Sequence, residues 1–505
     1  STLSNQYKET GNLGAMSSLI TRFIIENGAT LQTTAAVEMG TPIRLMTDEG
    51  GVINNSADFV MDKAFNGTKL TKRGSGTLKT YAAGSNLTRM VIAGGTVENN
   101  SGNAAQTVEL QGGALRDNVG TSNTIFVDKN KKGTWTTANR ATYSNTLSGE
   151  GEVTVFCATE KGSTWYATRT PLRLNLANFE GTLLPNATYT ADGRFTLDTS
   201  SGGNKFTLNI PEGIIVQNSG KTLRIGNLTG KGTLGGGCAF ENNVSVGANT
   251  WQVGNDKDFT FEGIVTSGDN FQKVGTGKMN VKGAWTHNGN INIGEGEIHL
   301  LTNGMLGTGA VTVAEGAALT GTGALTNSSV TVNGTLQVGL LTSSVSGVLD
   351  MGGKNVTIAR TGTYLIGARR CASNSTSGCA SITNVGRMTI NGTIEVFITS
   401  SSNFNTGDSI RVFDSSSFAG SPRFRLPLHY SWDTSRIKEG LLFITGYGID
   451  INGDATVDTQ DVLSIYEYMQ NVGSTGGADV PQDVNHDGVV DTQDVLMLYE
   501  YMAAN

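Results

Sequence analysis

The stretch GTGAVTVAEGAAL at residues 307–319 combines the two features that decide the fold. It opens with two glycines one residue apart and continues with apolar residues that alternate with polar or small ones. A glycine tolerates a positive φ, so paired glycines before a period-2 run are typical of a corner that enters a β-strand. The same Gly-x-Gly-x-apolar pattern returns at 74–78, 149–153, 230–234, 275–279 and 321–325. The sequence therefore predicts many short strands separated by sharp corners.

Length and composition favour a stack of such strands over a single compact core. The chain has 505 residues, of which 68 are Gly and only 7 are Pro. Chains of this length usually exceed one globular core. A sandwich, a propeller and a coiled solenoid all fit many short strands. We expect a mainly β solenoid, because the corner signals recur at short, uneven intervals without a blade motif.

Several other classes of protein are excluded. Helical periodicity is absent through about the first 440 residues, which rules out a doubly wound α/β fold and a dinucleotide-binding use of the glycine pairs. No basic stripe interleaved with aromatic residues is present, so we expect no nucleic-acid partner. No apolar run approaches the roughly 18 residues of a membrane-spanning helix, so we expect no transmembrane segment.

A second repeat lies near the C-terminus. DTQDVLSIYEYM at 458–469 returns as DTQDVLMLYEYM at 491–502, and each copy begins inside a twelve-residue loop, DINGDATVDTQD (450–461) or DVNHDGVVDTQD (483–494). Oxygen-bearing groups stand at loop positions 1, 3, 5, 7, 9 and 12, the spacing with which such a loop wraps calcium. We therefore predict two calcium ions. The expected ligands, with a main-chain carbonyl at position 7, are Asp450, Asn452, Asp454, Thr456, Asp458 and Asp461, then Asp483, Asn485, Asp487, Val489, Asp491 and Asp494.

The two loops differ at position 6, where such a loop turns sharply. This position is Gly488 in the second loop but Ala455 in the first, so we expect the first site to be more strained and to lose its ion sooner. Residues 447–505 contain eleven Asp or Glu and no Lys or Arg, which also favours a cation site. A helix should follow each loop, with apolar faces formed by Val462, Ile465, Tyr466 and Met469, and by Val495, Leu498, Tyr499 and Met502.

Two stretches of the strand-rich region resemble a known family. LTKRGSGTLKTYAAGSNLTRMVIAGGTVE (70–98) and FQKVGTGKMNVKGAWTHNGNINIGEGEIHL (271–300) are similar to the autotransporter-associated strand repeat of bacterial passenger proteins, in which a Lys precedes Gly-x-Gly-x-apolar. The resemblance implies a right-handed parallel β-helix in an exported bacterial protein. It places the β-helix at 70–446 and leaves residues 1–69 as an N-terminal cap or strand arm.

The C-terminal loops resemble a type I dockerin. Position 12 is Asp rather than the Glu of an EF-hand, and no helix precedes either loop. The resemblance implies that residues 447–505 bind calcium and dock onto a cohesin-like domain. The pairs at loop positions 10 and 11 correspond to those that dockerins present to cohesins, namely Thr459 and Gln460, and Thr492 and Gln493. Their identity fits either two equivalent binding faces or a recent duplication.

The junction FITGYGID (443–450) contains no Pro/Thr-rich linker. A mobile, tethered module would normally have one, so we expect the C-terminal module to pack against the last coil, where it would act as a cap. Elsewhere, Cys371 and Cys379 bracket a polar turn. We predict a disulfide between them, and two free thiols are the alternative.

Three functions stay open. The first is a non-catalytic extracellular or cell-surface β-helix, with an adhesive role or a glycan ligand. The second is a structural subunit that assembles head to tail into filaments with a neighbouring protomer. The third is a polysaccharide-acting enzyme held on a cohesin scaffold. We expect no catalytic residues, because the acidic residues of the β region are scattered singly and His287, His299 and His429 have no obvious carboxylate partner in sequence.

Overall fold

The computed structural model describes residues 23–25, 27–39, 43–45, 50–81, 86–138, 143–157, 172–186, 194–201, 203–218, 222–236, 249–266, 268–325, 329–338, 348–368, 381–398, 404–477 and 480–504. The chain divides into two compact units. The first contains Ser1–Met279 and Trp285–Gly289, and the second contains Asn280–Ala284 and Asn290–Asn505. Cys371 and Cys379 lie outside the described residues, so their predicted disulfide stays a prediction.

Within the described residues of the first unit, two parallel sheets contain 14 and 10 strands. The larger sheet consists of β1 (Phe23–Ile25), β2 (Thr30–Thr33), β4 (Ile43–Leu45), β5 (Gly51–Asn55), β7 (Phe65–Arg73), β9 (Asn86–Ile92), β11 (Thr107–Leu110), β13 (Thr124–Phe126), β15 (Ser144–Ser148), β17 (Leu172–Asn175), β19 (Arg194–Ser201), β21 (Ile215–Asn218), β24 (Thr233–Gly235) and β27 (Ile264–Thr266). The smaller sheet consists of β3 (Val37–Met39), β6 (Phe59–Met61), β8 (Thr77–Thr80), β10 (Thr96–Asn99), β12 (Ala114–Asp117), β14 (Lys132–Thr137), β16 (Glu152–Cys157), β18 (Thr182–Asn186), β20 (Thr207–Ile210) and β23 (Asn227–Gly230).

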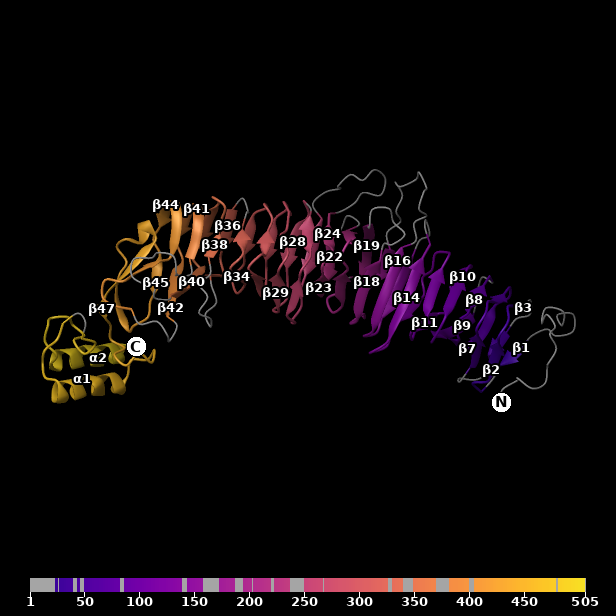
Figure 1. The fold of residues 1–505 in the computed structure, drawn as a ribbon, viewed down its shortest axis with the longest axis horizontal. Helices are drawn as coiled ribbons and strands as arrows, with labels where there is room; N and C mark the ends of the chain where they lie inside the picture. The colour runs from indigo at the N-terminus through magenta and orange to yellow at the C-terminus, as the bar shows by residue number, and fades with distance from the viewer. Residues whose placement is uncertain are drawn as a thin grey trace. The chain divides into compact units, whose positions relative to one another are not determined.

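From β7 to β19, consecutive strands of the first unit alternate between these two sheets (Figure 1). β7 pairs with β9 and β8 pairs with β10, both in parallel, so each coil of chain contributes one strand to each sheet. The parallel pairing includes strands before residue 70, because β1 pairs with β4, β2 with β5 and β3 with β6. The described strands of residues 1–69 are therefore coils of the same stack.

Coils of three strands begin within the first unit, where β22 (Thr222–Ile225) pairs with β25 (Thr250–Val253) and β25 pairs with β28 (Asn270–Lys273). The second unit also has coils of three strands. Most of its strands pair in parallel with the strand three places further along, as in β30–β33–β36–β39 and β31–β34–β37–β40. Near the end of the stack the step is two places, because β39 pairs with β41 and β40 pairs with β42. The strands are β30 (Ile291–Ile293), β31 (Glu297–Leu300), β32 (Met305–Leu306), β33 (Val311–Val313), β34 (Ala318–Gly321), β35 (Ala324–Leu325), β36 (Ser329–Val332), β37 (Thr335–Val338), β38 (Val348–Asp350), β39 (Asn355–Ile358), β40 (Thr363–Ala368), β41 (Ser381–Ile390), β42 (Thr393–Ile398), β44 (Phe413–Gly420) and β45 (Arg423–Arg425). The predicted mainly β solenoid with parallel strands is confirmed.

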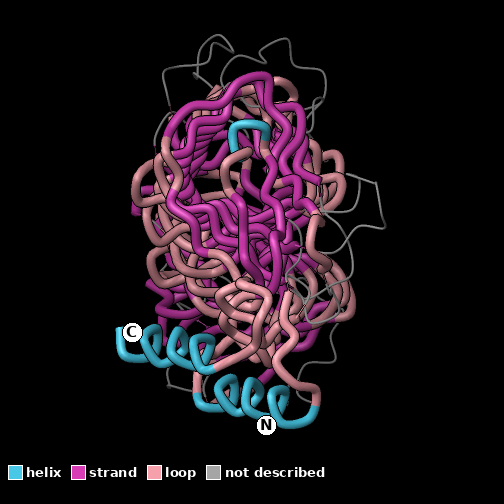
Figure 2. Tube along the Cα trace, turned by 90° about the vertical axis from the view of Figure 1, so that its left-hand side faces the viewer, coloured by secondary structure: helices cyan, strands magenta, loops and turns pink. Residues whose placement is uncertain are grey.

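The end of the strand-rich region is an antiparallel sheet. It contains β43 (Ser409–Arg411), β46 (Tyr430–Asp433) and β47 (Leu441–Tyr447), with β47 between the other two. Two helices follow, α1 (Thr459–Asn471) and α2 (Thr492–Ala504), and they lie side by side (cyan in Figure 2). No helix within the described residues is long and apolar enough to cross a membrane.

The core of the first unit consists of rows of apolar side chains that repeat from coil to coil. The period-2 alternation turns every second residue of a strand inward. In the smaller sheet, Leu78, Val97, Leu115, Trp135 and Val155 occupy one register row, and all five are fully buried. Parallel strands without insertions keep corresponding positions directly above one another from coil to coil. Each apolar side chain therefore packs on the side chain of the next coil, and such short strands bury a continuous core.

The paired glycines occupy corners, as predicted, and each pair is followed by a strand. At the pair before β8, Gly74 has a φ of 76°, and a Cβ on Gly76 would lie 2.2 Å from the carbonyl oxygen of Ala57 in the preceding coil. The first glycine supplies the turn and the second allows the coils to approach. The fully buried Lys72 lies beside this corner, where its Nζ donates hydrogen bonds to the carbonyl oxygens of Arg73, Gly74 and Gly94. This contact gives the lysine before Gly-x-Gly a structural role.

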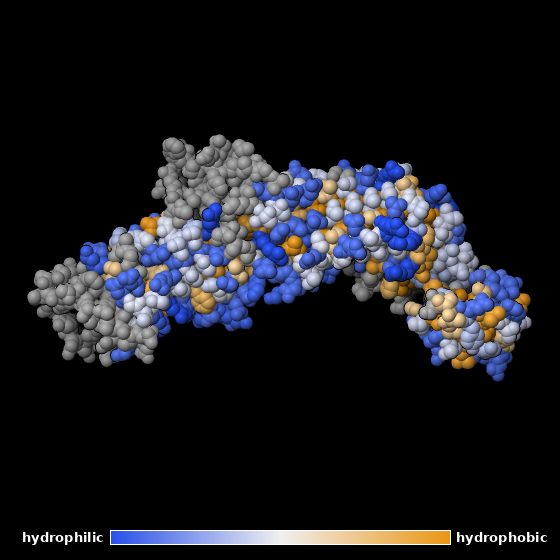
Figure 3. Space-filling model, turned by 180° about the vertical axis from the view of Figure 1, so that it is seen from behind, coloured by the Kyte–Doolittle hydropathy of each residue, from blue (hydrophilic) through white to orange (hydrophobic). Residues whose placement is uncertain are grey.

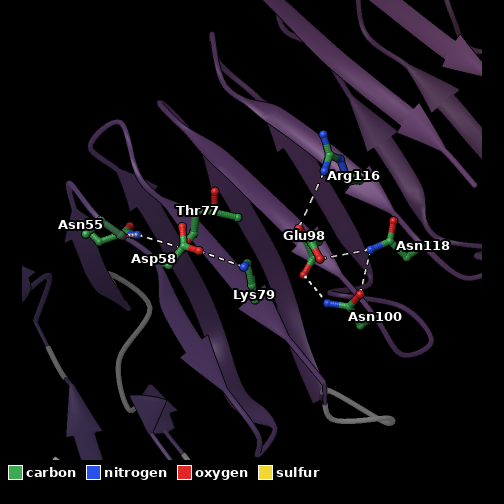
Figure 4. Close-up of polar contacts among 9 residues, drawn as sticks. Asn55, Asp58, Thr77, Lys79, Glu98, Asn100, Arg116 and Asn118 are labelled. Carbon is green, nitrogen blue, oxygen red and sulfur yellow. Dashed lines mark hydrogen bonds and ion pairs between the residues drawn. The ribbon is translucent and has the colours of Figure 1, made fainter. Parts of the chain in front are cut away.

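The outer face of the smaller sheet carries ladders of polar contacts between coils (Figure 4). Lys79 pairs with Asp58 at 2.8 Å, and Arg116 lies 3.9 Å from Glu98. Asn118 donates a hydrogen bond to Glu98 and another to Asn100. These side chains follow one another across β8, β10 and β12, so the charges of the outer face satisfy one another along the stack.

Candidate metal centre

The repeated DTQD tetrapeptides mark the start of the two helices. Asp458 is the N-cap of α1, and its side chain accepts a hydrogen bond from the main-chain N–H of Gln460. Asp461 reciprocates by accepting one from the N–H of Asp458, which completes a capping box. Asp491, Gln493 and Asp494 repeat both contacts at the start of α2. Loop positions 9 and 12 are thus fixed by helix capping.

In the first loop, the predicted ligand side chains turn toward main-chain N–H groups. Asp450 accepts hydrogen bonds from Gly453 and Ala455, and Asp461 accepts from Ile451 and Asn452 as well as from Asp458. The remaining contacts follow a rule in which each ligand side chain accepts from the N–H two residues ahead, as Asn452 does from Asp454 and Asp454 does from Thr456. The chain is thereby wound around its own acidic side chains.

The second loop repeats this pattern. Asp483 accepts a hydrogen bond from Gly488, and Asp494 accepts from Val484 and Asn485 at 2.7 and 3.1 Å, the distances found for Asp461 in the first loop. Asn485 accepts from Asp487, and Asp487 accepts from Val489. The sequence repeat is therefore also a repeat of hydrogen-bonded structure.

The carboxylates at positions 1 and 12 are buried. Asp450 is 2% exposed, and Asp461, Asp483 and Asp494 are fully buried. Burial raises the pKa of Asp450, whereas hydrogen bonds from Thr456 lower the pKa of Asp454. Several buried carboxylates in a segment that has no Lys or Arg favour a cation site.

The donor set of the loops fits calcium. Each loop offers four carboxylates, one amide oxygen and one carbonyl, which are hard oxygen ligands, and it offers no nitrogen or sulfur ligand at the ligand positions. Among the described residues, no three His, Cys, Asp or Glu side chains already converge as a metal cluster. The carboxylates of each loop instead accept hydrogen bonds from main-chain N–H groups.

Each loop contains one glycine and one other residue with a positive φ. In the first loop these are Gly453 (74°) and Ala455 (71°), and in the second they are Gly488 (88°) and His486 (57°). The glycine stands at position 4 in the first loop and at position 6 in the second. The strain that we expected in the first loop alone is thus present in both. A smaller difference persists, because His tolerates the left-handed region better than Ala.

The helices pack around a small apolar core, and one sequence prediction about it is wrong. Val462 and Ile465 of α1 and Val495 and Leu498 of α2 are buried together with loop residues Ile451, Val484 and Val490. Met469 and Met502 pack against this core, as expected. Tyr466 and Tyr499, however, are 46% and 49% exposed. Tyr468 packs against the core instead, so the buried face is rotated away from the position that we predicted.

The exposed face of each helix carries an equivalent apolar stripe. Leu463 and Tyr466 on α1 are 49% and 46% exposed, and Leu496 and Tyr499 on α2 are 50% and 49% exposed. The predicted partner residues Thr459, Gln460, Thr492 and Gln493 are exposed at the start of the same helices. Hydrophobic surface is visible on this helical region at the right of Figure 3.

Of the three histidines considered above, His299 makes side-chain contacts on its own sheet. His299 does have a carboxylate neighbour, because Glu297 lies 3.5 Å away on the same strand, and both contact Thr320. Strand alternation, which places residues two apart on the same face, was a signal that could have found this pair.

Residues 448–503 match the family model of the dockerin type I domain. The predicted dockerin module is therefore confirmed. No curated protein sequence matches the chain.

Proposed function

We propose that this chain is an extracellular, non-catalytic β-solenoid protein that attaches to a cohesin-type domain through its C-terminal region when that region holds calcium. Dockerin type I domains bind calcium and cohesin partners, and the match at 448–503 supports both properties for this chain. Proteins with such domains are typically extracellular or at the cell surface.

The main support for the proposal is that the same acidic loop and the same exposed apolar stripe occur twice in the C-terminal region. Two ions would be held by the twelve residues predicted from the sequence, with six oxygen-bearing positions in each loop. Calcium supplies the positive charge that the buried Asp450, Asp461, Asp483 and Asp494 lack. The chain itself supplies the winding of each loop and the start of each helix.

The partner surface is proposed at the stripes on α1 and α2. Each stripe combines two polar residues at the helix start with an exposed Leu and an exposed Tyr. Exposed Tyr side chains at matching positions favour contact with another protein, because Tyr is enriched among the residues that contribute most of the binding free energy, and the neighbouring Leu adds apolar area to each stripe. The two copies would offer equivalent surfaces.

A non-catalytic role for the solenoid is supported by the state of its outer charges. Ion pairs link neighbouring coils at Asp58–Lys79, Glu180–Lys205 and Glu395–Arg425. Carboxylates that are engaged in such ladders are typical of a structural surface. A surface or adhesive protein and a self-assembling subunit both fit this surface.

The partner proposal is tested by measuring binding of the full chain to a panel of immobilised type I cohesin domains, with calcium and with EDTA. We expect calcium-dependent binding to at least one cohesin. Loss of binding should require Leu463→Ala and Leu496→Ala together, if the two stripes are equivalent. Arg116→Ala, on the outer face of the solenoid, is the control and should bind normally. Binding that is indifferent to EDTA would contradict the proposal, and release of reducing sugar from polysaccharides by the chain would contradict its non-catalytic part.

A further inference from the structure

The first loop begins as a direct extension of the terminal antiparallel sheet. Only Gly448 and Ile449 separate the end of β47 from Asp450. The N–H of Gly448 donates to the carbonyl oxygen of His429 at 2.9 Å, and the N–H of Asp450 donates to that of Leu428 at 3.3 Å. A Cβ on Gly448 would lie 2.0 Å from the carbonyl oxygen of Leu428, so the two segments are in close contact. The loop is thus hydrogen-bonded to the segment that enters β46.

His429 contacts the first ligand position of the first loop. Its Nδ1 lies 2.6 Å from the main-chain oxygen of Asp450. A carbonyl oxygen can only accept, so Nδ1–H donates this hydrogen bond. The imidazole packs edge-on against Tyr430 and Tyr447, with ring centroids 4.7 and 5.6 Å away. These rings restrict the orientation of the imidazole. His429 therefore holds the main chain at the residue whose carboxylate opens the first ligand set.

Ser431 makes the corresponding contact with the second loop. Its hydroxyl donates a hydrogen bond to the carbonyl oxygen of Tyr447 at 2.8 Å and lies 3.2 Å from Nε2 of His486. Because the hydroxyl hydrogen is used toward Tyr447, Nε2 of His486 is the donor in the second contact. His486 is the residue at position 4 of the second loop, with a φ of 57°. Ser431 thus supports a residue in a conformation that costs free energy.

We infer that His429 and Ser431 are positioning residues that couple both calcium loops to the terminal sheet. Residues two apart on one segment contact one loop each, so a single edge of the sheet fixes both loops at once. Preorganisation of ligand positions raises affinity because less conformational entropy is lost when the ion binds. The inference rests on the calcium binding proposed above and adds that affinity and orientation depend on the solenoid's last strands.

The coupling also has a consequence for partner binding. The contacts with the sheet come from the loops, at Asp450 and His486, and the stripes on α1 and α2 stay exposed. A partner on either stripe would thus be held at a fixed orientation to the terminal sheet rather than on a mobile tether. Calcium would be required for this orientation as well as for the fold of the loops.

The test is calcium titration of the full chain by calorimetry, together with hydrogen exchange at residues 428–433. His429→Ala and Ser431→Ala should each weaken one site by about three- to tenfold, the range that one hydrogen bond contributes. His429→Gln retains a donor and should recover part of the affinity. His299→Ala, which removes a histidine of the solenoid without touching a loop, is the matched control and should bind like wild type.

In the wild type, calcium should slow exchange at residues 428–433, and in the double variant H429A/S431A it should not. Two-site binding with wild-type affinity in the double variant, with exchange at 428–433 still slowed by calcium, would overturn the inference and leave the proposed function intact. A wild-type chain that binds no calcium would overturn both. If the double variant shows an altered strand signal in circular dichroism, it is replaced by His429→Phe, which keeps an aromatic ring but removes the donor, and by Ser431→Ala as a single variant. Wild-type affinity at both sites in each of these variants would then overturn the inference.

Discussion

The solenoid and the C-terminal region reach a stable core by opposite routes. In the solenoid, rows such as Leu78, Val97, Leu115, Trp135 and Val155 bury apolar side chains coil after coil. In the C-terminal region the apolar core is small, and four buried carboxylates lie in its loops. We therefore expect the solenoid to be stable without an ion and the C-terminal region to need calcium for its fold. The two regions should then differ in what unfolds them, namely loss of core packing in the solenoid and loss of calcium in the C-terminal region.

The largest expected effect is the response to chelation. Removal of calcium with EDTA should abolish hydrogen-exchange protection throughout α1 and α2, because the buried carboxylates of both loops are then uncompensated. Protection in β11 to β14 should not change. Equal loss of protection in both regions, or in neither, would remove the contrast between them.

The solenoid core should respond to cavities and not to calcium. Leu115→Ala deletes a fully buried side chain from a stacked row and should lower the free energy of unfolding by about 2–5 kcal/mol. Arg116→Ala, one residue further on the same strand but facing outward, should change it by no more than about 0.5 kcal/mol. Chemical denaturation in EDTA measures both. Equal effects of the two substitutions would show that the row does not bear on stability.

Burial of Asp117 should make the stability of the solenoid depend on pH. Burial raises the pKa of Asp117 to about 6, although Asn99 and Trp135 donate hydrogen bonds to its carboxylate. Its folded pKa is above the unfolded value of 3.8, so its contribution is fully present below about pH 4 and is lost as the pH rises through about 6. The loss amounts to about 3 kcal/mol.

Asp117→Asn isolates this effect from the other acids of the chain. The difference in unfolding free energy between wild type and variant should change between pH 4 and 7 and be flat above pH 7. A difference that is constant from pH 4 to 7 would show that Asp117 does not titrate in this range.

The smallest expected effect is a difference in calcium affinity between variants of the two loops. Ala455→Gly relieves a left-handed conformation and should raise the affinity of the first site by up to about fivefold, which is about 1 kcal/mol. His486→Gly should give less, because it also removes the contact with Ser431. Calcium competition with a chromophoric chelator measures both. A loss of affinity in Ala455→Gly would show that this φ is not strained.

The sequence predicted the parts of the structure that depend on local spacing. Gly-x-Gly before an alternating run predicted the corners, and oxygen-bearing residues at fixed loop positions predicted both wound loops. Tyr466 was assigned to the core because it lies four residues after Val462, but helical spacing does not distinguish one edge of an apolar face from the other. The packing of Tyr468 decides this, and it depends on where the loops lie.

The contacts between the C-terminal region and the terminal sheet were out of reach of the sequence for a different reason. His429 and Asp450, and Ser431 and His486, are far apart along the chain, and no motif marks them. The missing linker did predict close packing, but only tertiary structure names the residues. Likewise, no Gly-x-Gly pair precedes residue 70, so the first coils had no local signal.

The number of calcium ions bound by the full chain, measured by isothermal titration calorimetry, decides whether both loops are calcium sites. We expect two ions per chain for the wild type, and one ion each for Asp461→Ala and Asp494→Ala, since each substitution removes the position-12 ligand of one loop. No binding by the wild type, or two ions in both variants, would contradict this expectation.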